Sequence, residues 1–403
     1  MSALFFPIQV GQCHLRHRVV MAPMTRRRAL DDHTPADMMV EYYAQRAAAP
    51  GTLLISEATS VSPRSAALPN TPGLFTVEQI EAWKPITTAV HARGSYIFAQ
   101  LWICGRAARA GAVKRGAEVV SASDVPLDAN APVPRPLSEP EILQLIDDYR
   151  TASVNAIEAG FDGVEVHGAN GYLVDQFTQD VSNRRTDAWG GSVEKRARFG
   201  IEVAKAIAGA IGADRVGYRV SPWSRHHSMR MNDPVPQFSY LVTQLRELKL
   251  AYLHIIEARV MGNTDSEGRE SIKFLVNIWG KTSPVIVAGG YNGTSAREAI
   301  ETVYSGSDVL VGFGRAFISN PDLPRRIQHD LPLAKYNRDL FYEVLEPKGY
   351  TDYPPIRELD GQHSVATAGS GGRCSQASDT AAAGVGGELT QLSPTIAGTV
   401  GAA

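Results

Sequence analysis

Short apolar runs and longer amphipathic stretches follow one another along most of this chain. A short apolar run bounded by turn residues predicts a buried strand, whereas apolar residues at every third or fourth position predict a helix. Buried strands are predicted at 18–23, 52–58, 96–101, 161–167, 215–222, 251–257, 284–290 and 308–315. Helices are predicted at 35–49, 76–91, 138–159, 192–211, 238–248, 272–279 and 295–304.

The alternation of strands and helices indicates parallel strand pairing, because each helix returns the chain to the same edge of the sheet. Roughly eight such units predict a (β/α)₈ barrel, whose functional residues lie at the C-terminal ends of the strands. A doubly wound sheet is the alternative, and its glycine-rich turn would follow the first strand. Here the first strand leads into Met24, Thr25 and Arg26 instead, which favours the barrel.

Three segments lie outside this alternation. Residues 4–10 and 13–15 predict a short hairpin before the barrel, and 104–136, rich in alanine, glycine and proline, predicts an excursion from it with a short hairpin near Val119 and Val120. The end of the chain is low in complexity and cannot build a core. We therefore expect a barrel domain at 1–360 and a disordered tail at 361–403.

Composition narrows the possible classes of protein. The chain has 403 residues, 44% of them hydrophobic, and a net charge of −2, which argues against a nucleic-acid-binding surface. Cys13, Cys104 and Cys374 have no metal-ligand spacing and predict neither a metal site nor a disulfide framework. No secretory signal and no run of ~20 apolar residues is present, so a cytoplasmic protein without membrane association is expected.

The end of the fourth predicted strand concentrates candidate chemistry. His167 ends the strand, and Asn170 and Tyr172 follow, separated by Gly168 and Gly171, which permit sharp turns. His167 and Asn170 can both donate to one carbonyl oxygen, and the phenol of Tyr172 keeps its proton near neutral pH. A purely structural role, in which His167 ends the strand, Asn170 turns the chain and Tyr172 packs, is equally compatible with this stretch alone.

The last two predicted strands end in glycines. Gly289 and Gly290 end one of them, and Gly314 ends the other with Arg315 immediately after it. In (β/α)₈ barrels this is where phosphate-binding loops are commonly found. Backbone N–H groups together with a guanidinium suit a phosphate dianion, so a phosphate-binding site is expected here.

Two further strand ends supply a complementary pair of polar groups. Gln100 offers an amide and Arg219 a fixed positive charge, although each alone is compatible with a loop cap or an ion pair. Together they suit a flat, polar, electron-accepting heterocycle such as a flavin, whose reduced anion a fixed cation stabilises. Thr25 could donate to the carbonyl edge of that ring.

These motifs, taken together, resemble the Old Yellow Enzyme family of FMN-dependent ene-reductases. They occur in the order of the family, from about residue 4 to about residue 356, and the tail after about 360 has no counterpart. The matching stretches are Met21–Arg26, Ala99–Trp102, His167–Leu173, Trp189–Ser192, Ala288–Gly290, Gly312–Arg315, Phe317–Leu323, Phe341–Tyr342 and Gly349–Pro354.

The resemblance implies a role for each site residue. The FMN-binding residues would be Pro23, Met24, Thr25, Ala58, Gln100 and Arg219 around the ring, and Gly289, Gly290, Gly314 and Arg315 at the phosphate end. The residues in contact with substrate would be His167 and Asn170 at the carbonyl oxygen, Tyr172 as proton donor, and Trp102, Phe341 and Tyr342 as pocket walls. Ala58 departs from the glycine of many members, and the less typical segment 223–233 could reshape one wall.

The resemblance also implies the reaction. NADPH would reduce FMN, and hydride would then pass to the β-carbon of an α,β-unsaturated carbonyl compound while Tyr172 protonates the α-carbon. The surroundings of the motifs are most similar to fungal members of specialised metabolism, which include ergot-alkaloid aldehyde reductases. A small-molecule substrate and a monomer or homodimer are expected.

Two other classes remain as alternatives. A barrel aldolase or isomerase would need a Schiff-base lysine or a carboxylate pair at the strand ends, and the sequence shows neither there. A flavin-binding protein without turnover would not need Tyr172.

Overall fold

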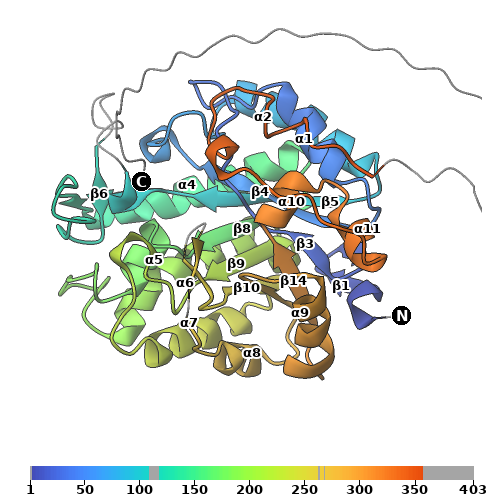
Figure 1. Cartoon of the computed structure of the whole chain (residues 1–403). Helices are drawn as coiled ribbons and strands as arrows, with labels where there is room; N and C mark the ends of the chain where they lie inside the picture. The colour runs from blue at the N-terminus through green and yellow to red at the C-terminus, as the bar shows by residue number, and fades with distance from the viewer. Residues whose placement is uncertain (1, 109–117, 262–263, 267, 357–403) are drawn as a thin grey trace, which may run out of the picture. The chain divides into compact units, whose positions relative to one another are not determined.

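A closed barrel of eight parallel strands forms the centre of the fold (Figure 1). The structure is a computed structural model that describes residues 2–108, 118–261, 264–266 and 268–356, so the predicted tail at 361–403 lies outside the described residues. The barrel strands are β3 (Val19–Met21), β4 (Leu53–Ser60), β5 (Tyr96–Trp102), β8 (Gly163–Gly168), β9 (Val216–Val220), β10 (Tyr252–Ile256), β13 (Val285–Ala288) and β14 (Val309–Phe313). Because β14 pairs with β3, the sheet closes, and the predicted (β/α)₈ barrel is confirmed while the doubly wound alternative is wrong.

Helices surround the strands and begin where the sequence signals predict. Thr76 caps the second helix, where its hydroxyl accepts a hydrogen bond from the N–H of Gln79 at 3.2 Å, and Ser138 and Glu141 form a capping box. The predicted helix at 295–304 is α-helical only as far as Glu298. A π-helical turn (Ala299–Val303) continues it. The helices are α1 (Met38–Arg46), α2 (Val77–His91), α4 (Glu139–Glu158), α5 (Leu173–Thr178), α6 (Val193–Ile211), α7 (Val235–Glu247), α8 (Lys273–Trp279), α9 (Gly293–Glu298), α10 (Arg315–Ser319) and α11 (Leu323–Gln328).

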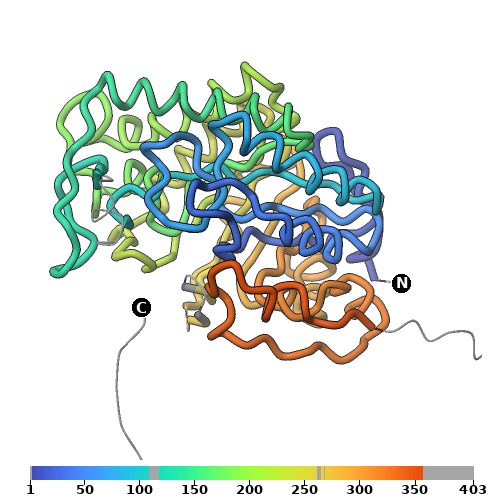
Figure 2. The backbone as a smooth tube through the Cα atoms, turned by 90° about the horizontal axis from the view of Figure 1, so that it is seen from above, coloured from blue at the N-terminus to red at the C-terminus, as the bar shows by residue number. Residues whose placement is uncertain are grey.

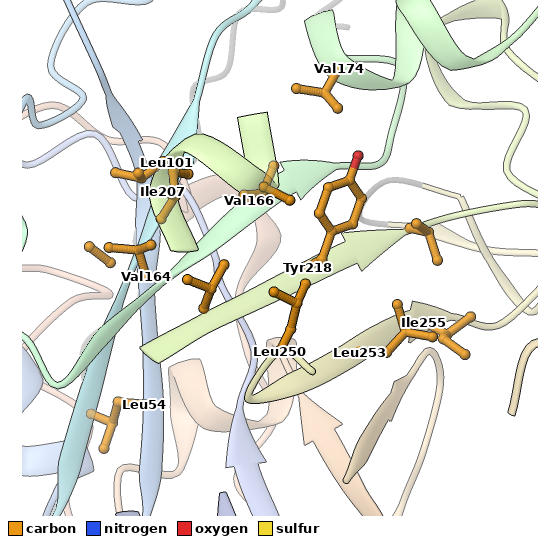
Figure 3. Close-up of a cluster of buried hydrophobic side chains, with 14 of the residues drawn as sticks. Leu54, Leu101, Val164, Val166, Val174, Ile207, Tyr218, Leu250, Leu253 and Ile255 are labelled. Carbon is orange, nitrogen blue, oxygen red and sulfur yellow. The ribbon is translucent and has the colours of Figure 1, made fainter. Parts of the chain in front are cut away.

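Alternate residues of each strand face the helices. Figure 3 shows this layer, in which Val164 and Val166 of β8 and Leu253 of β10 lie in the same apolar cluster as Ile207 of α6 and Val174 of α5. All five side chains are fully buried. The period of two along the strands therefore places one set of residues in the outer apolar layer and the other set inside the barrel.

The barrel interior changes from apolar to polar toward the C-terminal ends of the strands. Phe98 and Tyr252 fill the interior nearer the N-terminal ends of the strands. Their rings occupy the space that a Cβ atom would need at Gly163 and at Gly217, respectively. Further along the same strands, Gln100, Glu165, Arg219 and His254 are buried instead. A buried polar layer above an apolar one places the chemistry at one end of the barrel.

The N-terminal hairpin closes the opposite end, as predicted. Strands β1 (Ile8–Val10) and β2 (Cys13–Leu15) are antiparallel, and Val10, Cys13 and Leu15 belong to the same apolar cluster as the barrel residues Phe98 and Tyr252. Gly11 makes the turn with φ +52°, where a Cβ atom would lie 1.8 Å from the carbonyl oxygen of Asp214.

The hairpin predicted near Val119 and Val120 is wrong. Strand β6 (Val120–Ser121) pairs with β7 (Arg135–Pro136), but the two strands are parallel. Because the strands are parallel, the chain between them returns to the end where β6 starts before β7 begins. The alanine- and proline-rich composition did not indicate this return.

Buried arginines attach the segment after α11 to the start of the barrel. This segment, 331–356, lies beside α1 in both views (Figures 1 and 2), and the rings of Tyr42 and Tyr350 stack with centroids 4.0 Å apart. Arg26 donates from Nε to the carbonyl of Phe341 at 3.1 Å, and Arg28 donates from Nη1 to the same oxygen at 3.0 Å. Arg26 and Arg28, which lie in the loop after β3, thus hold this segment through its backbone carbonyls.

Candidate active site

The loop after β8 brings His167 and Tyr172 together. Asn170 and Gly171 follow the strand with φ values of +59° and +74°, so the chain turns sharply before α5 begins at Leu173. The rings of His167 and Tyr172 then meet edge to face, with centroids 4.9 Å apart. The glycine-punctuated loop predicted at this strand end is therefore present.

Hydrogen bonds from buried side chains hold this loop. The N–H of Asn170 donates to Oγ of Ser221 at 2.8 Å, and the N–H of Gly171 donates to Oδ2 of Asp175 at 2.8 Å. The side-chain amide of Gln176 donates to the carbonyl of Gly171 at 2.7 Å. Because these partners are buried and hydrogen-bonded, the positions of Asn170 and Tyr172 are defined by α5 and by the end of β9.

Trp102 of β5 packs against the same tyrosine. The Trp102 and Tyr172 rings meet edge to face with centroids 5.2 Å apart, and only 1% of Trp102 is exposed. Trp102 also belongs to a small apolar cluster with Ala58, which follows the bulge in β4. The structure thus places two predicted site residues from different strands beside the loop after β8.

His167 is buried and electrically neutral. Burial lowers its pKa well below the usual value, and the positive charge of Arg219 lowers it further. Arg219 lies directly across from His167 in the pairing of β9 with β8. A neutral imidazole can donate one hydrogen bond without bringing a second cation next to the guanidinium.

Glu165 and His254 form a buried network with Gln100 that sequence reasoning missed. The amide of Gln100 donates to Oε1 of Glu165 at 2.8 Å, and Nδ1 of His254 lies 2.7 Å from Oε2 of the same carboxylate. The side chains of Glu165 and His254 are fully buried. A charged residue and a histidine inside apolar strands were the available signal, since such residues are seldom buried without a partner.

Four buried nitrogens at this end of the barrel have no hydrogen-bond partner within the described residues. They are Nε1 of Trp102, Nδ1 of His167, Nε of Arg219 and Nε2 of His254, from four neighbouring strands. Buried polar atoms are nearly always hydrogen-bonded, so this group of nitrogens fits a polar ligand. A flavin ring, with carbonyl oxygens and ring nitrogens along its edge, has the matching chemistry.

The other predicted contacts with the flavin ring lie at adjacent strand ends. Pro23, Met24 and Thr25 follow β3 and are partly exposed. The sulfur of Met24 lies 3.5 Å from the position that a Cβ atom would take at Gly314, so the loops after β3 and β14 touch. Ala58 is 5% exposed and pairs with Gln100 across β4 and β5, which leaves its backbone beside the polar layer.

The predicted phosphate-binding residues lie at the ends of β13 and β14, which are paired strands. Gly289 and Gly290 have φ values of +131° and +67°, a backbone conformation that favours glycine. The guanidinium of Arg315 forms an ion pair with Asp265 and donates to the hydroxyl of Tyr336 at 3.2 Å. The carboxylate of Asp265 thus binds the guanidinium in the way that a phosphate oxygen could.

Phe341 and Tyr342 lie on the segment that Arg26 and Arg28 hold. Phe341 is 3% exposed and its ring contacts Tyr336, with centroids 5.5 Å apart, whereas Tyr342 is 44% exposed. Arg26 and Arg28 lie one and three positions after Thr25, so one short stretch of chain connects a predicted flavin contact with two predicted substrate contacts.

His227 is a second residue that the sequence-based list of site residues did not include. Its Nδ1 lies 2.8 Å from the carbonyl oxygen of Asn170, and its ring meets that of Tyr172 with centroids 5.1 Å apart. Arg106 fixes the backbone here by donating to the carbonyls of His227 and Ser228 at 3.1 and 3.2 Å. The less typical segment 223–233 therefore contacts the loop that carries Asn170 and Tyr172.

The described residues contain neither a metal-ligand cluster nor a membrane-spanning helix. Across 2–108, 118–261, 264–266 and 268–356, no group of three or more histidine, cysteine, aspartate or glutamate side chains could hold a metal ion. No helix in these parts of the chain is long and apolar enough to cross a bilayer.

Comparison with known proteins identifies relatives along most of the chain. Two are the chanoclavine-I aldehyde reductase fgaOx3 of Penicillium roqueforti, 53% identical over 88% of this chain and 96% of that protein, and the NADP-dependent oxidoreductase lnbE of Aspergillus flavus, 51% identical with the same coverage. A protein of Epichloe festucae named "Probable inactive reductase easA" is 47% identical over 89% of this chain and 96% of its own.

Structural comparison and a family model agree with these relatives. An Old Yellow Enzyme homologue from Zymomonas mobilis superposes with a TM-score of 0.81 and 38% identity, covering 87% of this chain and 99% of its own. The model of the NADH:flavin oxidoreductase / NADH oxidase family matches residues 3–334. The chain therefore belongs to this family, and the protein is an Old Yellow Enzyme-like flavin oxidoreductase with FMN as its cofactor.

Proposed function

We propose that this protein is an ene-reductase that uses NADPH to reduce the carbon–carbon double bond of α,β-unsaturated carbonyl compounds. The observation that best supports this is the buried, neutral His167, whose Nδ1 has no hydrogen-bond partner among the residues that the structure describes and whose ring contacts Tyr172. A donor for a carbonyl oxygen and a phenolic acid then lie side by side at the mouth of the barrel. Bound FMN supplies the chemistry that side chains lack, since it accepts a hydride from a nicotinamide and gives it up again.

His167 and Asn170 bind the substrate oxygen in this proposal. Negative charge develops on that oxygen when hydride reaches the β-carbon, and two fixed donors stabilise it more than they stabilise the neutral carbonyl. Ser221 holds the backbone of Asn170, so this donor is fixed before substrate binds. The low pKa of His167 keeps the imidazole neutral, and a neutral donor also stabilises the charge.

Tyr172 donates the proton to the α-carbon. Its ring contacts His167, Trp102 and His227, with centroid distances between 4.9 and 5.2 Å, and these contacts restrict where the hydroxyl can point. Trp102, Phe341 and Tyr342 form the walls of the substrate pocket. Thr25, Ala58, Gln100 and Arg219 hold the flavin ring, with Pro23 and Met24 beside them, and Gly289, Gly290, Gly314 and Arg315 hold its phosphate.

The relatives named as probably inactive supply the second candidate, a flavoprotein that does not carry out net reduction. Sequence identity does not separate the reductase from the inactive flavoprotein. The relative named as probably inactive is 47% identical to this chain, and the aldehyde reductase FrzD of Cladobotryum is 48% identical. The presence of Tyr172 favours the reductase, since a protein without this reaction has no need of a proton donor above the flavin.

A substrate screen tests the proposal. The purified protein should be yellow, with absorbance near about 450 nm, a general property of flavins. It should oxidise NADPH faster when a cyclic enone, an enal or a maleimide is added, and NADH should be the poorer reductant. Colourless protein that cannot be reconstituted with FMN would contradict the cofactor assignment, and yellow protein inert to every alkene would favour the second candidate.

We further propose that the substrate is an unsaturated aldehyde or ketone of fungal specialised metabolism. Two relatives, each matched over 96% of its length, are named as an aldehyde reductase and an NADP-dependent oxidoreductase. A cytoplasmic location and a monomeric or homodimeric state complete the proposal. Fluorescence localisation and light scattering would test them.

A further inference from the structure

A fully buried carboxylate lies next to the residues proposed to hold the flavin ring. Glu165 is on β8, one inward-facing position before His167, and its side chain has no exposed surface. Gln100 lies across from it on β5, and the next inward-facing residue of β9 toward the C-terminal end is Arg219. None of the roles proposed above uses this carboxylate.

We infer that Glu165 is a positioning residue, held by His254, that orients the amide of Gln100 and offsets the charge of Arg219, and that it thereby lowers the midpoint potential of bound FMN. This inference rests on the proposed contact of Gln100 and Arg219 with the flavin ring.

The geometry explains the orienting role. Both oxygens of Glu165 are occupied, one by the amide nitrogen of Gln100 at 2.8 Å and the other by Nδ1 of His254 at 2.7 Å. Because the amide nitrogen of Gln100 faces the carboxylate, the amide cannot rotate without losing a charge-assisted hydrogen bond. Glu165 therefore determines which atoms of Gln100 are presented to a ligand.

The electrostatics explain the effect on potential. Burial alone would raise the pKa of Glu165, but its hydrogen bonds with His254 and Gln100 and the positive charge of Arg219 lower the pKa below its usual value, so the carboxylate is ionised. Burial lowers the pKa of His254 despite the adjacent carboxylate, so the imidazole is neutral and donates through Nδ1. One negative charge thus faces the positive charge of Arg219. A lone guanidinium would favour the negatively charged reduced flavin more strongly than this pair does.

The decisive variant is Glu165→Gln. Its amide oxygen can accept from Gln100 while its NH₂ donates to the other tautomer of His254, so both hydrogen bonds can survive while the charge is lost. Reductive titration of the FMN-loaded protein should show that the ratio of reduced to oxidised flavin at a given potential rises at least tenfold. This change corresponds to a rise in midpoint potential of about 30 mV for two electrons. Glu165→Asp, which keeps the charge, is the matched control and should stay nearer the parent protein. An unchanged or lower potential in Glu165→Gln, or an equal rise in Glu165→Asp, would overturn the inference.

Arg219→Gln separates this inference from the proposed flavin site. It should lower the midpoint potential, and an FMN spectrum and potential equal to those of the parent would show that Arg219 is not at the ring. A lowered potential in Arg219→Gln together with no effect in Glu165→Gln would reject the role of Glu165 alone. If Glu165→Gln does not fold, the double variant Glu165→Gln/Arg219→Gln removes a balanced pair of charges. Its potential should lie above that of Arg219→Gln, and equal potentials would overturn the inference.

Discussion

At the scale of single residues, the proposed proton donor Tyr172 allows net reduction of an alkene to be separated from simple flavin oxidation. Tyr172→Phe removes only this hydroxyl and keeps the ring that packs between Trp102 and His167. We expect the variant to stay yellow and to consume NADPH with oxygen as acceptor. Reduction of weakly activated enones should fall by roughly 10²–10⁴-fold, the usual contribution of a general acid.

Steady-state rates for a weakly and a strongly activated alkene check this expectation. The strongly activated alkene should be less affected, because its anion can take a proton from water. An unchanged enone rate at equal FMN content would mean that another group supplies the proton.

In the proposed mechanism, His167 and Asn170 act as a pair on the substrate oxygen. Replacing both by alanine should leave FMN bound, because their proposed partner is the substrate, and should weaken the binding of simple phenols, whose oxygen would occupy the place of the substrate oxygen. Spectroscopic titration measures the dissociation constant directly. Phenol binding as tight as in the parent protein would show that the oxygen-binding assignment is wrong.

At the scale of elements, α5 supports the loop after β8 through Asp175. This carboxylate accepts hydrogen bonds from the N–H of Gly171 and from the side-chain amide of Gln179, both at 2.8 Å. Burial outweighs these hydrogen bonds and raises the pKa of Asp175 to about 7. The folded protein therefore binds a proton here between about pH 4 and pH 7, where the unfolded chain does not.

The effect of Asp175→Asn should depend on pH for this reason. A raised pKa in the folded state contributes stability that is fully present below the pKa of the unfolded chain and is lost as the pH rises toward about 7. The free energy of unfolding of the parent, relative to that of Asp175→Asn, should thus be larger at pH 5 than at pH 8. Urea denaturation of both proteins at the two pH values measures this difference. An equal or larger difference at pH 8 would mean that the pKa of Asp175 is not raised in the folded protein.

The buried arginine Arg28 joins the end of the β3 strand to the segment that carries Phe341. Its guanidinium donates to the carbonyls of Leu340, Phe341, Glu346 and Lys348 at 3.0–3.2 Å. Arg28→Ala would remove the donor for the carbonyls of Leu340, Glu346 and Lys348, while Phe341 would keep the hydrogen bond from Arg26. We expect the free energy of unfolding to fall by about 3 kcal/mol, since a hydrogen bond from a charged group contributes about 1.5–3 kcal/mol.

The matched control for this prediction is Arg64→Ala. The Arg64 side chain is 65% exposed and reaches Glu141 only at 4.0 Å, so its loss should cost little. Equal stability of the two variants in chemical denaturation would show that Arg28 does not hold the segment.

At the scale of the whole molecule, the chain is longer than the part that the family model matches. The family model ends at residue 334, and fgaOx3 of Penicillium roqueforti matches 88% of the chain, so neither match spans the whole sequence. We predict that deletion of the residues after Val365 leaves FMN content and turnover nearly unchanged. Absorbance at the flavin band and NADPH oxidation with an enone measure both. Loss of flavin after truncation would show that the tail contributes to the barrel.

The sequence by itself determined the elements and much of the site. Continuous apolar runs such as 284–290 and amphipathic stretches such as 192–211 have different periods, and this local property is readable without coordinates. Residues at strand ends could be grouped because every strand of a closed parallel barrel ends at the same face. His167, Asn170 and Tyr172 were grouped in this way, and in the structure the ring of His167 contacts that of Tyr172 while the N–H of Asn170 donates to Ser221.

Only the tertiary structure decided which distant residues meet. Glu165 and His254 are 89 positions apart, and their hydrogen bond depends on the register of three strands. The same holds for His227 beside Tyr172 and for Asp265 beside Arg315, which come from separate loops. The parallel pairing of β6 with β7 was likewise missed, because the path of an irregular loop leaves no periodic pattern in the sequence. Local periodicity follows from the backbone of each segment, whereas contacts between segments follow from how the closed barrel aligns its strands.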